Sequence, residues 1–227
     1  MELDSNRQEI LPMLAETPSV RIHFSQLGED CLIWHRFHSL IGGFYVDAGC
    51  HDPMRYSNTY LLHRFRKWRG INIDADERAI AKFQAVRPTD INLNLGVGLT
   101  EAEGEFAVFG DGAVNTFDPA MAQQQASTFG SPATKKIRIR PLAQILDEYA
   151  PERTQINYMN IDCEGLDHEV VLSNNWSKYR PQLLTVELFS LSLEQPLAND
   201  TAAFLIEHGY KLRSYCHATA FFEDVSG

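Results

Sequence analysis

Short hydrophobic runs recur along the chain, and amphipathic stretches separate them. The runs are rich in β-branched and aromatic residues, which is typical of strands, and they cover residues 42–49, 70–74, 91–98, 156–161 and 183–187. In the third run apolar residues alternate strictly with Asn and Gly, so we expect one continuous strand there.

The stretches between these runs carry apolar residues at helical spacing. We expect helices that begin at Ser25 and at Pro141, a short one from Gly165, and two more over residues 57–67 and 200–208. Strands that alternate with helices predict an α/β fold, with a mostly parallel sheet covered by helices on both faces.

The middle and the ends of the chain are less regular. Residues 105–109 and 135–140 are expected to be strands, and the Gln-, Ala-, Ser- and Gly-rich segment 110–134 between them a lid loop. Residues 1–24 are expected to form an N-terminal leader, and residues 25–227 a single domain. The last two apolar runs predict an antiparallel hairpin, and they cover residues 210–215 and 219–222.

Composition limits the class of protein and its partners. A chain of 227 residues with 44% hydrophobic content suits one globular α/β domain. The net charge of −10 repels phosphate backbones, so we expect no nucleic-acid partner. No apolar run reaches the ~20 residues that cross a bilayer, and the polar N-terminus is unlike a secretory signal. The four cysteines form no CxxC pair, which argues against a zinc site and a disulfide scaffold and predicts a cytoplasmic location.

Acidic residues stand at the ends of four predicted strands: Asp47, Asp74, Asp162 and Glu187. Ligands of open α/β sheets bind at the carboxyl ends of the strands, and core packing does not favour carboxylates, because burying one unpaired costs several kcal/mol. These residues are therefore candidates for a binding site. The alternative is that they cap helices or pair with arginines.

Asp74 ends the second strand of a βαβ unit, where a carboxylate can accept hydrogen bonds from two ribose hydroxyls. The first loop of that unit, residues 47–53, has one glycine, Gly49, where the dinucleotide fingerprint has three. A nucleoside ligand without a pyrophosphate, such as S-adenosylmethionine, therefore fits better than NAD or FAD.

The chain resembles the FkbM family of methyltransferases over about residues 25–190. The resemblance rests on short segments in the family's order: SQLGED (25–30), FYVDAGCHDP with SNT (44–53, 57–59), WRGINIDAD (68–76), RPTDINLNLGVG (87–98), NTF (115–117), NIDCEGLDHEVVL (160–172) and RPQLLTVE (180–187). It implies the class I methyltransferase fold, a Rossmann-like, seven-stranded sheet, and methyl transfer from S-adenosylmethionine, usually to a hydroxyl. It also implies that Asp47, Gly49 and Asp74 bind the cofactor. The chain departs from the family pattern at Asp74, where a Glu is common, and at Cys50, where a small residue is usual.

Further cofactor residues are expected around this loop. Ser57, Asn58 and Thr59 begin a helix whose free N–H groups suit the cofactor carboxylate, although Ser57 can also act as a simple helix cap. His51 either lines the cofactor loop, acts as a base or bonds to backbone only. The resemblance places Gln26 and Glu29 near the methionine tail, and Asn94 completes the expected cofactor set.

The expected reaction centre follows the fourth main strand. Asp162 and Glu164 can deprotonate a hydroxyl, with His51 as a third candidate base. Asp162 and Glu187 can share a divalent cation such as Mg²⁺, which prefers oxygen ligands and acidifies a bound hydroxyl. The alternative for Glu187 is a hydrogen bond to a substrate hydroxyl or to backbone. His168 is expected to be a solvated helix residue.

These observations predict an O-methyltransferase that acts on a hydroxyl of a small molecule or glycan, most often a sugar. Asn115 and Thr116 in the lid are candidates for contact with substrate or cofactor. The basic run Lys135, Lys136, Arg138 and Arg140 is expected to be a solvated strand face, with a phosphate site as the alternative. Two other functions stay open: a nucleotide-dependent oxidoreductase, disfavoured by the missing glycines, and a non-catalytic cofactor-binding protein, disfavoured by the acids of the expected reaction centre.

Overall fold

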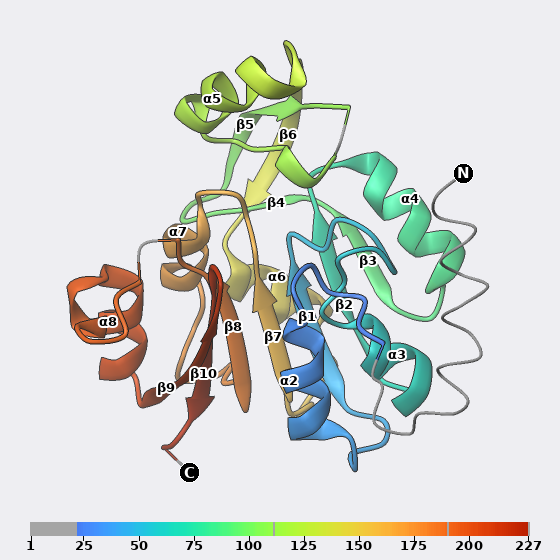
Figure 1. Cartoon of the computed structure of the whole chain (residues 1–227). Helices are drawn as coiled ribbons and strands as arrows, with labels where there is room; N and C mark the ends of the chain where they lie inside the picture. Colours follow the sequence, from blue (N-terminus) through green and yellow to red (C-terminus); the bar gives the residue numbers. More distant parts are fainter. Residues whose placement is uncertain (1–21, 111, 190, 227) are drawn as a thin grey trace, which may run out of the picture.

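Seven strands form the main sheet of the computed structural model, which describes residues 22–110, 112–189 and 191–226 (Figure 1). Their order is β3-β2-β1-β7-β8-β10-β9, and their bounds are Phe44–Ala48 (β1), Arg69–Asp74 (β2), Ile91–Asn94 (β3), Tyr158–Ile161 (β7), Leu183–Glu187 (β8), Tyr210–Cys216 (β9) and Thr219–Asp224 (β10). The first five are parallel, and β10 runs antiparallel to both of its neighbours. The predicted α/β fold with an antiparallel hairpin is confirmed, and the sheet is consistent with the class I methyltransferase fold.

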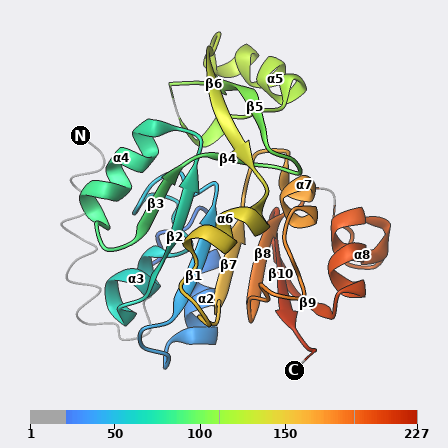
Figure 2. The ribbon, with the colours of Figure 1, turned by 180° about the vertical axis from the view of Figure 1, so that it is seen from behind.

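Helices cover both faces of this sheet because its strands are apolar on both sides. On one face lie α6 (Leu142–Tyr149), α7 (Asp167–Leu172) and α8 (Asp200–Glu207), and α6 is seen in front of the sheet in Figure 2. On the other lie α2 (Glu29–Phe37) and α3 (Tyr60–Arg66), which bury Ile33 and Leu62 against Tyr45. Within the described residues, every helix is too short or too polar to span a lipid bilayer.

Not every helix matches the predictions. Helix α3 begins at Tyr60, with Thr59 and not Ser57 at the N-cap position. Helix α2 begins at Glu29 and not at Ser25, whose hydroxyl instead accepts hydrogen bonds from the N–H groups of Gly28 and Asp30. Helix α4 (Glu77–Val86) was not predicted at all. It buries Ala79, Ile80 and Phe83, and Asp76 caps it by accepting a hydrogen bond from the Arg78 N–H at 2.9 Å.

A second, three-stranded sheet carries the middle of the chain, with the order β4-β6-β5. It consists of β4 (Gly96–Val97), β5 (Ala102–Val108) and β6 (Ala133–Arg140). The prediction of one strand over residues 91–98 is therefore wrong: β3 pairs with β2 in the main sheet, whereas β4 pairs with β6. An alternating pattern reports one buried face but does not tell which neighbour the strand pairs with.

The segment 110–134 is not a loop throughout. It contains a 3₁₀ turn, η1 (Gly112–Val114), and helix α5 (Pro119–Phe129), for which Asp118 caps the first turn. None of the α5 residues is buried, so the hydrophobic periodicity that would reveal a helix is absent. Residues 96–140, with the second sheet and α5, are called the insertion below; its strands and α5 lie above the main sheet in Figure 1.

The leader expected over residues 1–24 lies almost wholly outside the described residues.

Candidate functional site

A row of polar side chains crosses the middle of the main sheet. In register on five adjacent parallel strands stand Asn92, Asn72, Asp47, Asn160 and Thr185. Asn72 donates to Asn92 at 2.8 Å, Asn160 donates to Asp47 at 3.0 Å, and the Thr185 hydroxyl donates to the Asn160 oxygen at 2.7 Å. Four of the five are buried, with Asn92 half-buried, so the row is a fixed polar floor rather than a solvated surface.

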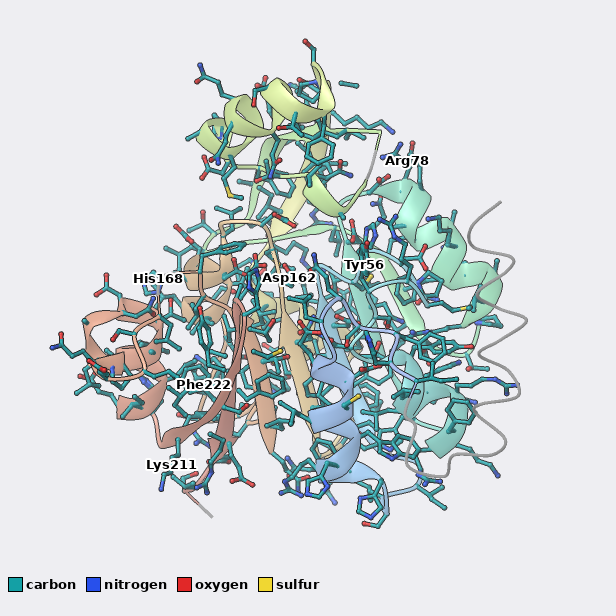
Figure 3. The ribbon with its side chains drawn as sticks, viewed as in Figure 1. Tyr56, Arg78, Asp162, His168, Lys211 and Phe222 are labelled. Carbon is teal, nitrogen blue, oxygen red and sulfur yellow. The ribbon has the colours of Figure 1, made fainter. Side chains whose placement is uncertain are left out.

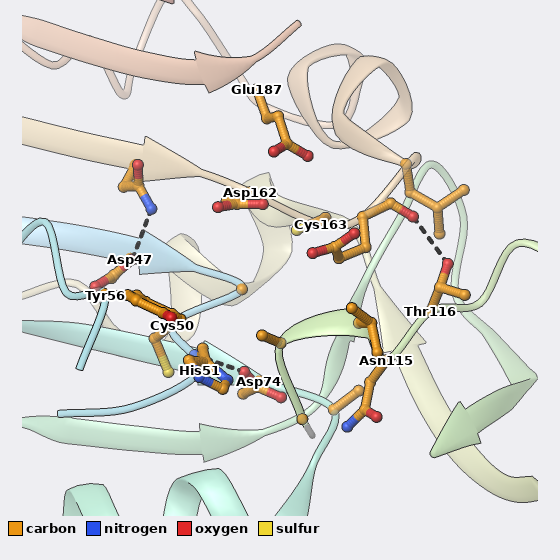
Figure 4. A pocket seen from close by; sticks show the side chains of 18 of the residues that line it. Asp47, Cys50, His51, Tyr56, Asp74, Asn115, Thr116, Asp162, Cys163 and Glu187 are labelled. Carbon is orange, nitrogen blue, oxygen red and sulfur yellow. Dashed lines mark hydrogen bonds between the residues drawn. The ribbon is translucent and has the colours of Figure 1, made fainter. Parts of the chain in front are cut away.

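A cavity of about 310 Å³ opens next to this floor, at the carboxyl ends of the strands (Figure 4). All four strand-end acids predicted from the sequence line it: Asp47, Asp74, Asp162 and Glu187. The other predicted site residues in its lining are Gln26, Glu29, Gly49, His51, Ser57, Asn58, Asn115, Thr116 and Glu164. The convergence expected from strand order is therefore present.

Two predicted cofactor residues lie outside the lining. The Thr59 hydroxyl donates to Asp47 at 2.9 Å, and Asn94 donates to the carbonyls of Asp74 and Ala75 at 3.0 and 2.9 Å. Both residues therefore support lining residues from behind.

The other polar residues singled out from the sequence lie away from the cavity. His168 is half-buried and not solvated as expected, with Nδ1 at 2.8 Å from the Thr201 hydroxyl; it lies outside the lining and to the left of Asp162 in Figure 3. The basic run of β6 pairs with Glu77, Glu103, Glu101 and Glu148, and it contributes nothing to the lining. This arrangement gives no support to a phosphate site on that strand.

Gly49 allows the ends of β1 and β7 to approach each other. Its φ is 81°, and a Cβ atom at this position would lie 1.7 Å from the carbonyl oxygen of Asp162. Any side chain would therefore collide with backbone, and the left-handed conformation adds strain for any other residue. The expected cofactor loop and the expected reaction centre are in direct contact because this residue is glycine.

Asp74 is held by the backbone on both of its oxygens. Oδ2 accepts the His51 N–H at 2.8 Å, and Oδ1 accepts the Asp76 N–H at 2.7 Å. Burial raises its pKa to about 6, although these two hydrogen bonds act to lower it. The carboxylate keeps further lone pairs that can accept hydrogen bonds from a ligand.

Three carboxyl groups gather at the other side of the cavity. Asp162 and Glu187, on neighbouring strand ends, point into the same space in Figure 4. Burial, and then repulsion by Glu187 and Asp167, raises the pKa of Asp162 well above its usual range. Burial followed by repulsion from nearby carboxylates also raises the pKa values of Glu164 and Glu187 to about 8.

Nothing in the described lining neutralises this group, because the lining holds no Lys or Arg. The Glu187 Oε2 atom is buried without a hydrogen-bond partner among the described residues. Over the same part of the chain, no group of three or more His, Cys, Asp or Glu side chains is placed to hold a metal ion. Glu164 and Glu187, whose pKa values are raised to about 8, therefore stay largely protonated at neutral pH unless a cation enters.

Left-handed backbone conformations concentrate around the cavity. Four of the six described non-glycine residues with positive φ line it, namely His51, Tyr56, Glu164 and His217, with φ from 48° to 59°. Such strain persists only where the surrounding structure imposes it, and it clusters at functional sites. The exposed side chain of Phe189, 67% accessible, also lines the cavity.

The insertion connects the two sides of the cavity. Asn115 donates to Asp76 at 3.0 Å beside the end of β2, and the Thr116 hydroxyl donates to the Glu164 carbonyl at 2.8 Å beyond the end of β7. Phe117 and Gln125 add to the lining. The insertion thus forms one wall, and its action as a lid stays a prediction.

Several residues of the site were not predicted. Tyr56, Phe189 and His217 line the cavity, and Arg87 lies behind it, fully buried. Arg87 belongs to a segment that resembles the family, but a single Arg in a sequence reads as a surface residue. Only its contacts with distant parts of the chain identify it.

The family model described as the methyltransferase FkbM domain matches residues 47–212, which is well over half of the chain. No curated protein and no solved structure matches the chain significantly.

Proposed function

Because the chain belongs to the FkbM family of S-adenosylmethionine-dependent methyltransferases, we propose that it methylates a hydroxyl of a small molecule or glycan, preferentially a sugar. The observation that carries the proposal is the cavity with Asp74 on one side and three carboxyls on the other. Carboxylates suit a polyhydroxyl acceptor and can take its proton. The acidic lining and the net charge leave nucleic acids outside the proposed acceptor class, and the proposed location is the cytoplasm.

The cofactor is proposed to lie along the loop that follows β1. Asp74 accepts hydrogen bonds from the ribose hydroxyls, and Asp47, Gly49 and His51 border the same space. Ser57 and Asn58, with Gln26, face the methionine part, which carries an ammonium and a carboxylate. Thr59 and Asn94 act indirectly, through Asp47 and the end of β2.

The acceptor is proposed to enter beside Asp162 and Glu164. S-adenosylmethionine supplies the methyl group, whose bond to sulfur breaks, with its electron pair kept by sulfur, as the acceptor oxygen attacks in line. The acceptor proton passes to Glu164 or Asp162, and His51 is the third candidate. A base with a pKa of about 8, as burial and Asp162 give Glu164, matches a neutral working pH.

A divalent cation between Asp162 and Glu187 is a further part of the proposal. Two carboxylates leave most coordination positions of such a cation to water and to acceptor oxygens, so the cation would bind fully only with the acceptor present. Methyl transfer should then stop in excess EDTA and return with Mg²⁺ or Mn²⁺. Full activity in excess chelator would leave Asp162 or Glu164 as a plain general base.

Two experiments test the proposed function. Calorimetric titration should show binding of S-adenosylhomocysteine, the product form of the cofactor, and none of NAD; binding of NAD alone would favour the oxidoreductase alternative. Incubation with methyl-labelled S-adenosylmethionine and a panel of free sugars should then label at least one hydroxylated acceptor. Binding without transfer to any hydroxyl, amine or thiol in a broadened panel would favour a non-catalytic protein.

A further inference from the structure

Arg87 is a completely buried cation directly after α4, with 0% of its surface exposed. Its Nη1 donates to the hydroxyls of Tyr45 and Thr59 at 3.0 and 2.8 Å. Its Nη2 donates to the Ser57 hydroxyl at 3.0 Å and to the Pro53 carbonyl. All four acceptors are neutral, so the guanidinium is used for its fork of donors and not as half of a direct ion pair.

The backbone of Arg87 is fixed by hydrogen bonds. The Arg87 backbone N–H donates to the Phe83 carbonyl at 2.7 Å, and the Arg87 carbonyl accepts the Asp90 N–H and an Asn92 amide hydrogen, both at 3.1 Å. The guanidinium carbon lies 5.0 Å from the centre of the buried Phe83 ring. A guanidinium held in this way can serve as a rigid anchor for whatever it bonds.

The contacts divide into two groups that point to different parts of the fold. One group binds the loop after β1, at Pro53, Ser57 and Thr59, and we call it the loop arm. The other runs into the core through Tyr45, whose hydroxyl donates to Asp90 at 2.5 Å, and we call it the core arm. The loop arm continues to Asp47, because Thr59 also donates to that carboxylate.

The loop arm holds the far part of the cofactor loop, which the Asn58 amide also joins to Asn160 of β7 at 3.1 Å. The first turn of the loop is bonded to β2, through Gly49 and Cys50 to the Ile73 carbonyl. Farther along, the Ser57 N–H donates to the Phe24 carbonyl at 3.1 Å, and Arg87 adds its three hydrogen bonds. The cavity residues Tyr56, Ser57 and Asn58 lie within this span.

We propose that Arg87 is a positioning residue for the cofactor: its loop arm sets the conformation of residues 53–59 and the orientation of Asp47 that S-adenosylmethionine binding needs. The proposal rests on the proposed function, since it assigns the loop to that cofactor. Arg87 itself does not line the cavity and touches neither the cofactor nor the acceptor. Its positive charge also faces Asp47 from behind and favours the ionised carboxylate there.

Substitutions in the two arms separate positioning from plain stability. Thr59→Val keeps the shape of the side chain but removes the hydroxyl that joins Arg87 to Asp47, so the dissociation constant for S-adenosylhomocysteine should rise about tenfold or more. Thr59→Ser keeps the hydroxyl and should bind like the wild type. Tyr45→Phe cuts the core arm, so it should lower the melting temperature while the dissociation constant stays within about twofold.

Arg87→Lys keeps the charge but has one nitrogen in place of the fork, so it should lose at least as much affinity as Thr59→Val. Arg180 offers the matched control. It makes a similar network with Asp224 at 2.7 Å and with the carbonyls of Trp176 and His208, away from the cavity. Arg180→Lys should lower the melting temperature without changing the dissociation constant.

Calorimetry and thermal unfolding of these five variants decide the matter. Arg87 would have only a structural role if Thr59→Val bound S-adenosylhomocysteine with wild-type affinity. The same conclusion would follow if Arg180→Lys and Arg87→Lys lost equal affinity at matched melting temperatures. If Arg87→Lys folds poorly, the two Thr59 variants still test the positioning role, because they leave Arg87 in place. A wild type that binds no S-adenosylhomocysteine would instead overturn the proposed function, and with it the ligand that Arg87 serves.

Discussion

At the scale of single residues, the cavity brings together acids whose surroundings differ. Asp74 is bonded twice by backbone and has a pKa raised to about 6 by burial, whereas the pKa values of Glu164 and Glu187 reach about 8 through burial and repulsion by nearby carboxylates. Groups whose environments separate their pKa values often divide the work of binding and of proton transfer. The two sides of the cavity should therefore respond differently to substitution.

Asp74→Ala should weaken S-adenosylhomocysteine binding at least tenfold, because it removes two charge-assisted hydrogen bonds of roughly 1.5–3 kcal/mol each. In the wild type, binding should strengthen as pH rises through about 6, where Asp74 ionises in the free protein. Calorimetry between pH 5 and 8 measures both effects.

Asp52→Ala is the matched control for Asp74. Asp52 lies in the same loop, outside the lining, and pairs with Lys82 at 2.8 Å. Its replacement should change the dissociation constant by less than about threefold. An unchanged dissociation constant in a folded Asp74→Ala variant would remove Asp74 from the ribose site.

Asp162→Asn should lower the turnover number about 10²-fold or more, because it keeps the shape of the side chain but removes a base or a cation ligand. The affinity for S-adenosylhomocysteine should change little. Steady-state methyl transfer to the sugar acceptor found in the panel, together with calorimetry, gives the two values. If turnover is unaffected, the reaction centre lies elsewhere, and Glu164→Gln and then His51→Gln are the next variants to measure.

At the scale of secondary-structure elements, the sequence pattern predicted what hydrophobic burial dictates. Strand β8 lies where it was expected, and α6 follows Pro141 as expected, because their apolar residues face the core. Helix α5 was missed because none of its residues is buried, and the split between β3 and β4 was missed because sheet membership depends on partners far away in the sequence. Capping residues, Asp76 and Asp118, were the available signals for α4 and α5.

Helix α5 lies against the proposed reaction centre at Gly165. A Cβ at Gly165 would lie 2.4 Å from the Met121 sulfur of α5, and its φ is 97°. Gly165→Ala should therefore destabilise the protein through both collision and backbone strain, by roughly 1–3 kcal/mol. Met121→Ala in the same chain should recover the collision part only.

Urea unfolding of the two single variants and the double variant measures this coupling. The double variant should be more stable than the sum of the single losses predicts, by at least about 0.5 kcal/mol. Additive losses would mean that the flexible Met121 side chain moves away from the added methyl group without cost, and that the loss in Gly165→Ala comes from backbone strain alone.

At the scale of the whole molecule, the sequence pattern predicted which strand ends converge, but it did not predict the buried residues that support them. The convergence of Asp47, Asp74, Asp162 and Glu187 follows from strand order alone. The role of Arg87 depends on contacts with residues 28 to 42 positions away along the chain, which no local pattern encodes. Contacts of this kind, between buried supporting residues, can be identified only in the folded structure.

The raised pKa values predict how the stability of the ligand-free protein depends on pH. Asp74 and Asp167 near 6, and Glu164 and Glu187 near 8, keep protons in the folded chain that the unfolded chain has released. The folded state then binds more protons, so stability falls as pH rises from about 6 to 8.5. Acids with lowered pKa values, such as Asp90, act in the opposite direction only at more acidic pH.

Urea unfolding should show a lower free energy of unfolding at pH 8.5 than at pH 6. Asp162→Asn should make this difference smaller, because it removes one of the repelling carboxyls. Saturating S-adenosylmethionine, which carries a net positive charge, should reduce it as well. Stability that rises across this range in the wild type would mean that the carboxyls are neutralised by a group outside the described residues.

The insertion leaves and re-enters the main fold at neighbouring points, since the Gly98 N–H donates to the Arg140 carbonyl at 3.2 Å. Its length and sequence can therefore change without moving the strands that carry Asp47 and Asp74. We expect that exchanging the insertion would replace one wall of the cavity, and with it the acceptor preference, while the residues proposed to bind the methyl donor stay in place on the main sheet.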